Sequence, residues 1–273
     1  MIRVGVMASI LWKEKNYLAD VQYIIGRHIY EYDISKANIN VLYYLGEIDC
    51  DYYEKLKRMP RMKRQIEIGY LLKYNEGLAD KLSDGISNFR RLLFEANQLE
   101  DMDILSIKND AVFVIGKRLS VTKFDNVEFV LKNHYTTYIR LDRHLEIYAE
   151  SNSIDGTMSL DVKGISDMNL EMHHQYMATM IADVVYYMET NDIKDGLTYL
   201  GDIYNQYIEK QLPPGYYRNF NAQSDFTISA NGTNYSMTFC TQDMYGALDI
   251  GCNLNIIRTL YGYLTNLYMQ QYS

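Results

Sequence analysis

Two short apolar runs flank the polar pair Asn109-Asp110, and this segment constrains the fold more than any other in the chain. Residues 104–107 and 111–115 are rich in Ile, Leu and Val, which is typical of strands. Asn and Asp both tolerate the backbone of a tight turn. We therefore predict a β-hairpin with Asp110 at its crest. Another strand-like run, 27–33, ends in a second acid, Asp33.

The pattern on either side of this hairpin predicts an α+β protein. Leu78, Leu82, Ile86, Phe89 and Leu93 recur at helical spacing, which indicates a helix over 78–97. Branched and aromatic residues favour strands elsewhere. Expected strands are 21–33, 126–131, 135–141, 144–148, 158–163 and a hairpin over 226–239; expected helices start near 37, 168, 194 and 244. We expect an antiparallel sheet with packed helices over 1–163 and a mostly helical region over 164–273.

The composition excludes several classes of protein. The chain has 273 residues and 48% hydrophobic content, which fits a globular protein with one large or two small domains. Its three cysteines are scattered and predict neither a disulfide framework nor a zinc knuckle. No apolar run approaches the length of a membrane span, and no cleavage site follows the first residues. We expect a cytoplasmic protein without membrane contact.

The charge is uneven along the chain. The formal net charge is −8, yet residues 55–64 hold six cations. A run of this kind is either a solvated face or a basic groove for phosphates, and the sequence leaves both open.

Strand-borne aspartates held side by side can clamp two Mg²⁺ ions at a phosphoryl-transfer centre. Asp33 and Asp110 are the candidates for this role, and Lys63 and Arg64 lie on an expected helix where cations could meet phosphates. Each aspartate also has an ordinary explanation. Asp110 could serve the turn alone, and Asp33 could be the N-cap of the helix that follows it.

The order of motifs resembles that of template-directed polymerases. Residues 32–42 (YDISKANINVL) are similar to motif A of family A or family B DNA polymerases, residues 64–69 (RQIEIG) to their motif B helix, and residues 105–114 (LSIKNDAVFV) to their motif C on its hairpin. Residues 132–135 (KNHY) resemble the Lys-Lys-x-Tyr element and residues 161–165 (DVKGI) the Lys-Gly strand of family B DNA polymerases. The resemblance covers about residues 27–211.

This resemblance implies a palm with fingers reduced to about 46–97, followed by a helical thumb. It implies two Mg²⁺ ions as cofactors, held by Asp33 and Asp110. The remaining implied contacts are Ile34, Ser35, Asn38, Lys63 and Arg64 with the incoming nucleoside triphosphate, and Lys132, Tyr135, Lys163 and Gly164 with the primer-template.

Some positions depart from the family pattern. Lys108 stands where family B keeps its first motif C aspartate, and Asn38 stands where a bulkier Glu or Tyr excludes the ribose 2′-hydroxyl. The stretch before motif A leaves no room for an exonuclease or N-terminal domain, so we expect another protein subunit to supply the missing parts.

Three hypotheses follow. The first is a viral palm and thumb that performs Mg²⁺-dependent nucleotidyl transfer in the host cytoplasm. The second is a non-catalytic nucleic-acid- or protein-binding subunit of a replication or transcription complex, with carboxylates more than about 8 Å apart, too wide for a metal pair. The third is an α+β protein of unknown binding function in which Asp33 caps a helix.

Overall fold

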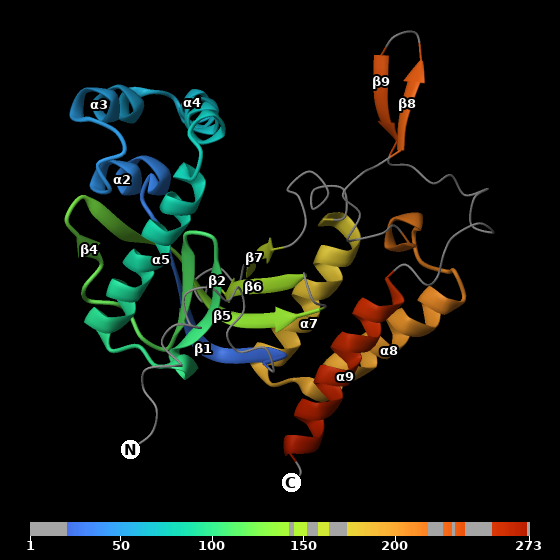
Figure 1. Cartoon of the computed structure of the whole chain (residues 1–273). Coiled ribbons are helices and arrows are strands. Elements are labelled where there is room, and N and C mark those ends of the chain that lie inside the picture. The colour runs from blue at the N-terminus through green and yellow to red at the C-terminus, as the bar shows by residue number, and fades with distance from the viewer. Residues whose placement is uncertain are drawn as a thin grey trace. The chain divides into compact units, whose positions relative to one another are not determined.

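The computed structural model describes residues 21–141, 145–151, 158–163, 174–217, 226–230, 233–237 and 253–271. The chain divides into two compact units (Figure 1). Unit 1 holds residues 28–134 of the described chain, and unit 2 holds residues 21–27 and those from 135 onward. The strands β1 (Tyr23–Ile34) and β5 (Val127–Arg140) run from one unit into the other.

In unit 1 the strands follow the order β2-β3-β1-β5, with the short β4 (Lys123–Phe124) paired to β5. β2 (Ile104–Lys108) and β3 (Ala111–Ile115) form the predicted hairpin, and Lys108 pairs with Ala111 across a two-residue loop. β3 also pairs with β1 in antiparallel register. All five residues of β3 are buried, as expected for an apolar strand with a neighbour on each side.

Four helices lie between β1 and the hairpin: α2 (Ala37–Tyr44), α3 (Cys50–Arg58), α4 (Arg61–Tyr74) and α5 (Leu78–Asn97). A short 3₁₀ turn, η1 (Asp101–Asp103), leads into β2. The basic run 55–64 is divided between α3 and α4. Met59 is extended and Pro60 follows it, because proline disfavours helical backbone in the residue before it.

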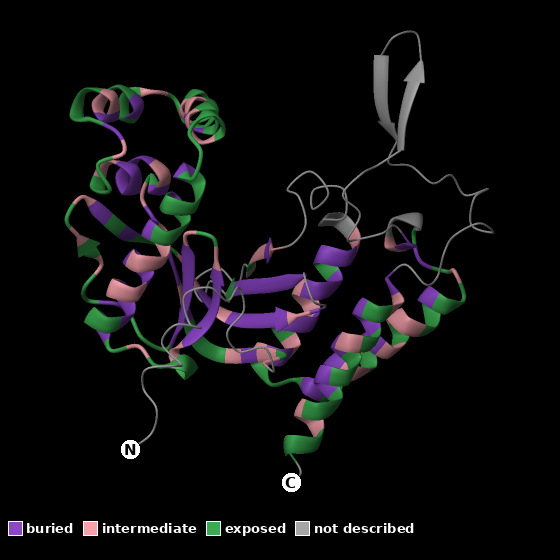
Figure 2. Cartoon of the chain, in the orientation of Figure 1, coloured by how far each residue is buried: buried purple, intermediate pink, exposed green. Residues whose placement is uncertain are grey.

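The helix over 78–97 is confirmed with the predicted ends. Its apolar residues face the core of unit 1, while its other face is exposed (Figure 2). Gly85 permits a close approach to α2, because a Cβ atom there would lie 2.6 Å from Cγ1 of Val41 and 3.0 Å from Cδ1 of Leu45.

Unit 2 continues the antiparallel pattern with β5-β6-β7, where β6 spans Glu146–Ser151 and β7 spans Met158–Lys163. Its helices are the π-helical turn η2 (His174–Ala178), α7 (Thr179–Thr190), α8 (Ile193–Ile208), the 3₁₀ turn η3 (Pro214–Tyr217) and α9 (Leu254–Gln271). The strands β8 (Phe226–Ala230) and β9 (Thr233–Met237) form a separate hairpin. One apolar core joins β5 and β6 to α7, α8 and α9.

The α+β class, the antiparallel sheet preceded by helices within unit 1, and the later helices are confirmed. Two of the expected strands, 126–131 and 135–141, are in fact one strand, β5. The expected starts of helices near 168 and 244 lie outside the described residues. The palm and thumb assignments and the boundary at residue 163 stay predictions. No helix in the described part of the chain is long and apolar enough to cross a membrane.

Candidate functional site

Asp33 and Asp110 are brought to neighbouring positions by the register of unit 1. Asp33 lies on β1 and pairs with Ala111 of β3, the residue directly after Asp110. Asp110 occupies the second position of the loop between β2 and β3. Both line the same cavity. α2 begins with Lys36 as its N-cap and without a side-chain capping bond, so the alternative in which Asp33 caps this helix is wrong.

The Asp33 carboxyl group influences the Asp110 carboxyl group electrostatically. The pKa of Asp110 is raised, first by burial and then by the negative charge of Asp33, whereas Lys132 and the backbone amide of Asp110 itself lower it. An influence of this kind requires carboxyl groups at close range. Oδ1 of Asp33 is buried and has no hydrogen-bond partner. A buried carboxylate oxygen without a donor is costly, and a bound cation would remove that cost.

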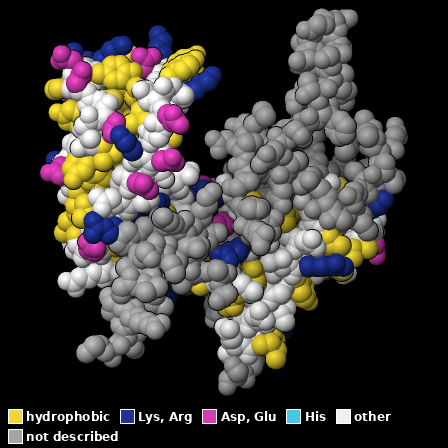
Figure 3. All heavy atoms as spheres, viewed as in Figure 1, with side chains coloured by type: hydrophobic (Ala, Val, Ile, Leu, Met, Phe, Trp, Pro, Cys, Tyr) yellow, Lys and Arg dark blue, Asp and Glu magenta, His cyan; other side chains and the backbone are white. Residues whose placement is uncertain are grey.

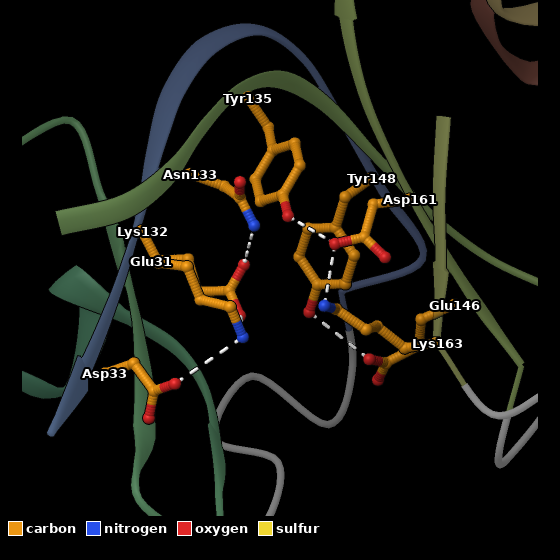
Figure 4. A network of polar contacts seen from close by, with 9 residues as sticks. All are labelled: Glu31, Asp33, Lys132, Asn133, Tyr135, Glu146, Tyr148, Asp161 and Lys163. Atoms are coloured by element: carbon orange, nitrogen blue, oxygen red, sulfur yellow. Dashed lines mark hydrogen bonds and ion pairs between the residues drawn. The ribbon is translucent and has the colours of Figure 1, made fainter. Parts of the chain in front are cut away.

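Lys132 of β5 supplies a positive charge to the same place. Its Nζ lies 3.5 Å from Oδ2 of Asp33 and 3.7 Å from Oε1 of Glu31 (Figure 4). Glu31 is only 2% exposed, and Asn133 donates to its Oε2 at 2.6 Å. The sequence predicted a primer contact for Lys132; in the structure its ammonium group lies against the acidic groups of β1.

A cavity of about 450 Å³ opens beside the aspartates, within the range of small-molecule sites. Asp33 and Asp110 line it together with residues 34–39. Four cations also line it: Lys36, Arg61, Arg64 and Lys132. A cavity lined by both carboxylates and cations is suited to a ligand that carries both metal ions and phosphate groups.

A buried amide fixes the backbone segment that lines this cavity. Asn40 of α2 is 7% exposed, donates from Nδ2 to the Ser35 carbonyl at 2.6 Å and accepts from the Tyr53 hydroxyl at 2.9 Å. The Ser35 amide donates to the Glu128 carbonyl of β5 at 2.9 Å. These bonds hold the turn after Asp33 on both sides.

A second cavity of about 530 Å³ lies between α4, α5 and the β2–β3 hairpin. It shares Asn38, Arg61, Gln65 and Asp110 with the first cavity. Asn38 therefore lies where the two spaces meet, and the sugar preference inferred from it stays a prediction.

The other predicted contacts are distributed unevenly. Ile34, Ser35 and Arg64 line the first cavity, whereas Lys63 is exposed on α4 and lines neither cavity. In unit 2, the Tyr135 hydroxyl donates to Asp161 at 2.5 Å and Lys163 lies 2.6 Å from the same carboxylate (Figure 4). Gly164 lies outside the described residues. The roles of these residues toward nucleic acid stay predictions.

Sequence reasoning missed Arg61 and Gln65, which line both cavities. Their spacing contained a usable signal. Arg61, Arg64, Gln65 and Ile68 recur at i, i+3, i+4 and i+7, one face of a helix, and all four line the first cavity.

On the face drawn in Figure 3, Lys and Arg side chains of unit 1 are interspersed with Asp and Glu. This mixture agrees with the negative net charge of the chain.

Among the described residues, no group of three or more His, Cys, Asp or Glu side chains is arranged to hold a metal ion. Asp33 and Asp110 therefore form a two-carboxylate site. Mg²⁺ in proteins is often bound by one or two carboxylates with substrate phosphates and water completing the shell. The residues present fit that kind of bound ion.

Comparison with known proteins places the chain in a family. No curated protein matches the chain, and the description of the family names no activity. Its model, described as Bacteriophage PBS1 gene 130 protein, matches residues 7–265, and because this span covers most of the sequence, the chain belongs to that phage protein family.

Proposed function

We propose that this chain is the catalytic palm-and-thumb part of a template-directed nucleotidyltransferase of the DNA polymerase type. The observation that carries the proposal is the Asp33–Asp110 pair, which faces a cavity lined by four cations. The order of these residues in the sequence, which resembles that of family B polymerases, supports it further.

The reaction needs little covalent chemistry from the protein. The primer 3′-oxygen loses its proton to solvent water and bonds to the α-phosphorus of the nucleoside triphosphate, while the bond from that phosphorus to pyrophosphate breaks. Asp33 and Asp110 would hold two Mg²⁺ ions, which neutralise charge on the reacting phosphate when bound. The orphaned Oδ1 of Asp33 and the raised pKa of Asp110 support a divalent cation there.

The cations of the cavity would hold the triphosphate. Arg61 and Arg64 lie on the same face of α4 and both line the space, so their guanidinium groups can donate to phosphate oxygens. Lys132 already lies beside Asp33, and it would offset the negative charge gathered around the reacting groups.

The expected partners follow from this activity: a primer-template, a nucleoside triphosphate and a second protein subunit. We infer that they meet in the host cytoplasm, since the family is a phage family.

A second candidate is a non-catalytic subunit that binds nucleic acid or protein. The ion pair between Lys132 and Asp33 favours it, because an ammonium group can take the place of a metal ion in a site that has lost its activity. The effect of Asp33 on the pKa of Asp110 favours the catalytic function, because a shared metal pair requires the two carboxylates to lie close together.

Primer extension by the purified protein in its active complex tests the proposal. Wild-type protein is expected to add nucleotides in a Mg²⁺-dependent way, and Asp110→Ala is expected to lose at least about 100-fold in rate, as when an essential charge-stabilising group is removed. Lys63→Ala is the matched control, because Lys63 lines neither cavity. Undiminished extension by Asp110→Ala would show that the assignment is wrong, and template binding without extension by wild type would favour the second candidate.

A further inference from the structure

A buried arginine connects the helix α5 to the turn that holds Asp110. Arg90 is 7% exposed, and a buried charge is tolerated only where it is hydrogen-bonded. Its Nη1 donates to the Asn109 carbonyl at 2.6 Å, and its Nη2 donates to Ser87 Oγ at 2.9 Å. One end of the guanidinium is thus held by α5 and the other holds the hairpin.

The acceptor of this bond belongs to the peptide group that leads into Asp110. The Asn109 carbonyl and the Asp110 amide share one planar unit, so a donor that fixes the oxygen also fixes the amide nitrogen of Asp110. Asn109 is in the left-handed region, with φ 55°, which few residues other than glycine adopt readily. A charged donor on the carbonyl stabilises this turn.

We propose that Arg90 is a positioning residue, which holds the Asn109–Asp110 peptide so that the Asp110 carboxylate is directed at the metal ions shared with Asp33. This inference rests on the proposed function. Arg90 acts on Asp110 through the backbone, by its hydrogen bond to the Asn109 carbonyl.

The neighbouring Arg91 shows what an ordinary arginine on this helix does. Its side chain is 40% exposed and pairs with Glu95 one turn later at 3.2 Å. It also donates to the side chain of Asn88 at 2.7 Å. Arg91 contacts no residue of the hairpin through these bonds, so it provides a matched control on the same helix.

Binding of Mn²⁺, measured by calorimetry on the full chain without substrate, tests the inference. Arg90→Lys and Arg90→Gln are expected to weaken Mn²⁺ affinity by about 10- to 100-fold, the effect typical of residues that orient metal ligands. Arg91→Gln is expected to bind as wild type does. In primer extension, the Arg90 variants are expected to lose kcat with little change in the nucleotide KM, because Arg90 is assigned to the metal ligand.

Circular dichroism establishes that each variant is folded. Arg90→Lys keeps the buried charge and carries the test if Arg90→Gln does not fold. Wild-type protein that binds no Mn²⁺ at Asp33 and Asp110, with or without a nucleoside triphosphate, would overturn the proposed function itself. Wild type that binds Mn²⁺, together with a folded Arg90→Lys variant that binds it equally well, would overturn only the role of Arg90.

Discussion

Replacing Asn40 with alanine removes the amide that fixes the backbone segment lining the first cavity. The substitution deletes the donor to the Ser35 carbonyl and the acceptor for the Tyr53 hydroxyl. The Tyr53 side chain is buried, so its hydroxyl is left without a partner, which costs about 1–3 kcal/mol. The Ser35 carbonyl is only partly buried and loses about 1 kcal/mol after access to water is allowed for. We expect a total loss of about 2–4 kcal/mol.

Urea unfolding followed by circular dichroism measures this loss. Tyr53→Phe removes only the hydroxyl and should cost about 1 kcal/mol, and the double variant should cost less than the sum because the two groups share one bond. Asn75→Ala is the control: its amide also bonds a carbonyl, that of Leu71, but in an exposed position, so a change within about 0.5 kcal/mol is expected. A loss below about 1 kcal/mol for Asn40→Ala would show that the Asn40 amide does not stabilise the fold in this way.

Three further outcomes are expected. Asp110→Asn should stabilise the metal-free protein at neutral pH, because the folded-state pKa of Asp110 is raised above 3.8. The ionised carboxylate therefore destabilises the folded state fully above the folded-state pKa and not at all below the unfolded-state pKa. The difference in unfolding free energy between variant and wild type should vanish in acid, and a difference that stays constant with pH would contradict this. Gly85→Ala should lower the free energy of unfolding by about 1–3 kcal/mol through overpacking against Val41. An unchanged midpoint of thermal unfolding would contradict this prediction. Arg64→Ala should raise the nucleotide KM about 10- to 100-fold by loss of a charged contact, whereas Lys63→Ala should leave the KM unchanged. Equal KM values for the two variants in steady-state kinetics would contradict a contact between Arg64 and the nucleotide.

Local patterns predicted much of the fold. The apolar residues of α5 recur at helical spacing and are buried, and this is why both ends of that helix were predicted correctly. The Asn109-Asp110 hairpin followed from turn chemistry between two apolar runs. The division of the basic run at Pro60 was also readable, since the residue before proline avoids helical backbone.

Long-range contacts could not be predicted from local sequence patterns. Lys132 meets Asp33 across 99 positions of sequence, and Arg90 meets the Asn109 carbonyl from a different element. The polar residues Lys132, Asn133 and His134 suggested a break between two strands, yet β5 continues through them, because backbone pairing tolerates polar side chains where one face is wet. Pairing of the carboxylates depended on the register of β1 with β3, which no local pattern specifies.

The central claim is that Asp33 and Asp110 share a pair of divalent cations. Anomalous scattering from crystals soaked with Mn²⁺ and a nucleoside triphosphate tests it most directly. Two Mn²⁺ peaks are expected between the two carboxylates, about 3.5–4 Å apart as in other two-metal sites, with triphosphate density beside Arg61 and Arg64. Crystals that show nucleotide but no Mn²⁺ at these aspartates, with Lys132 still paired to Asp33, would contradict it.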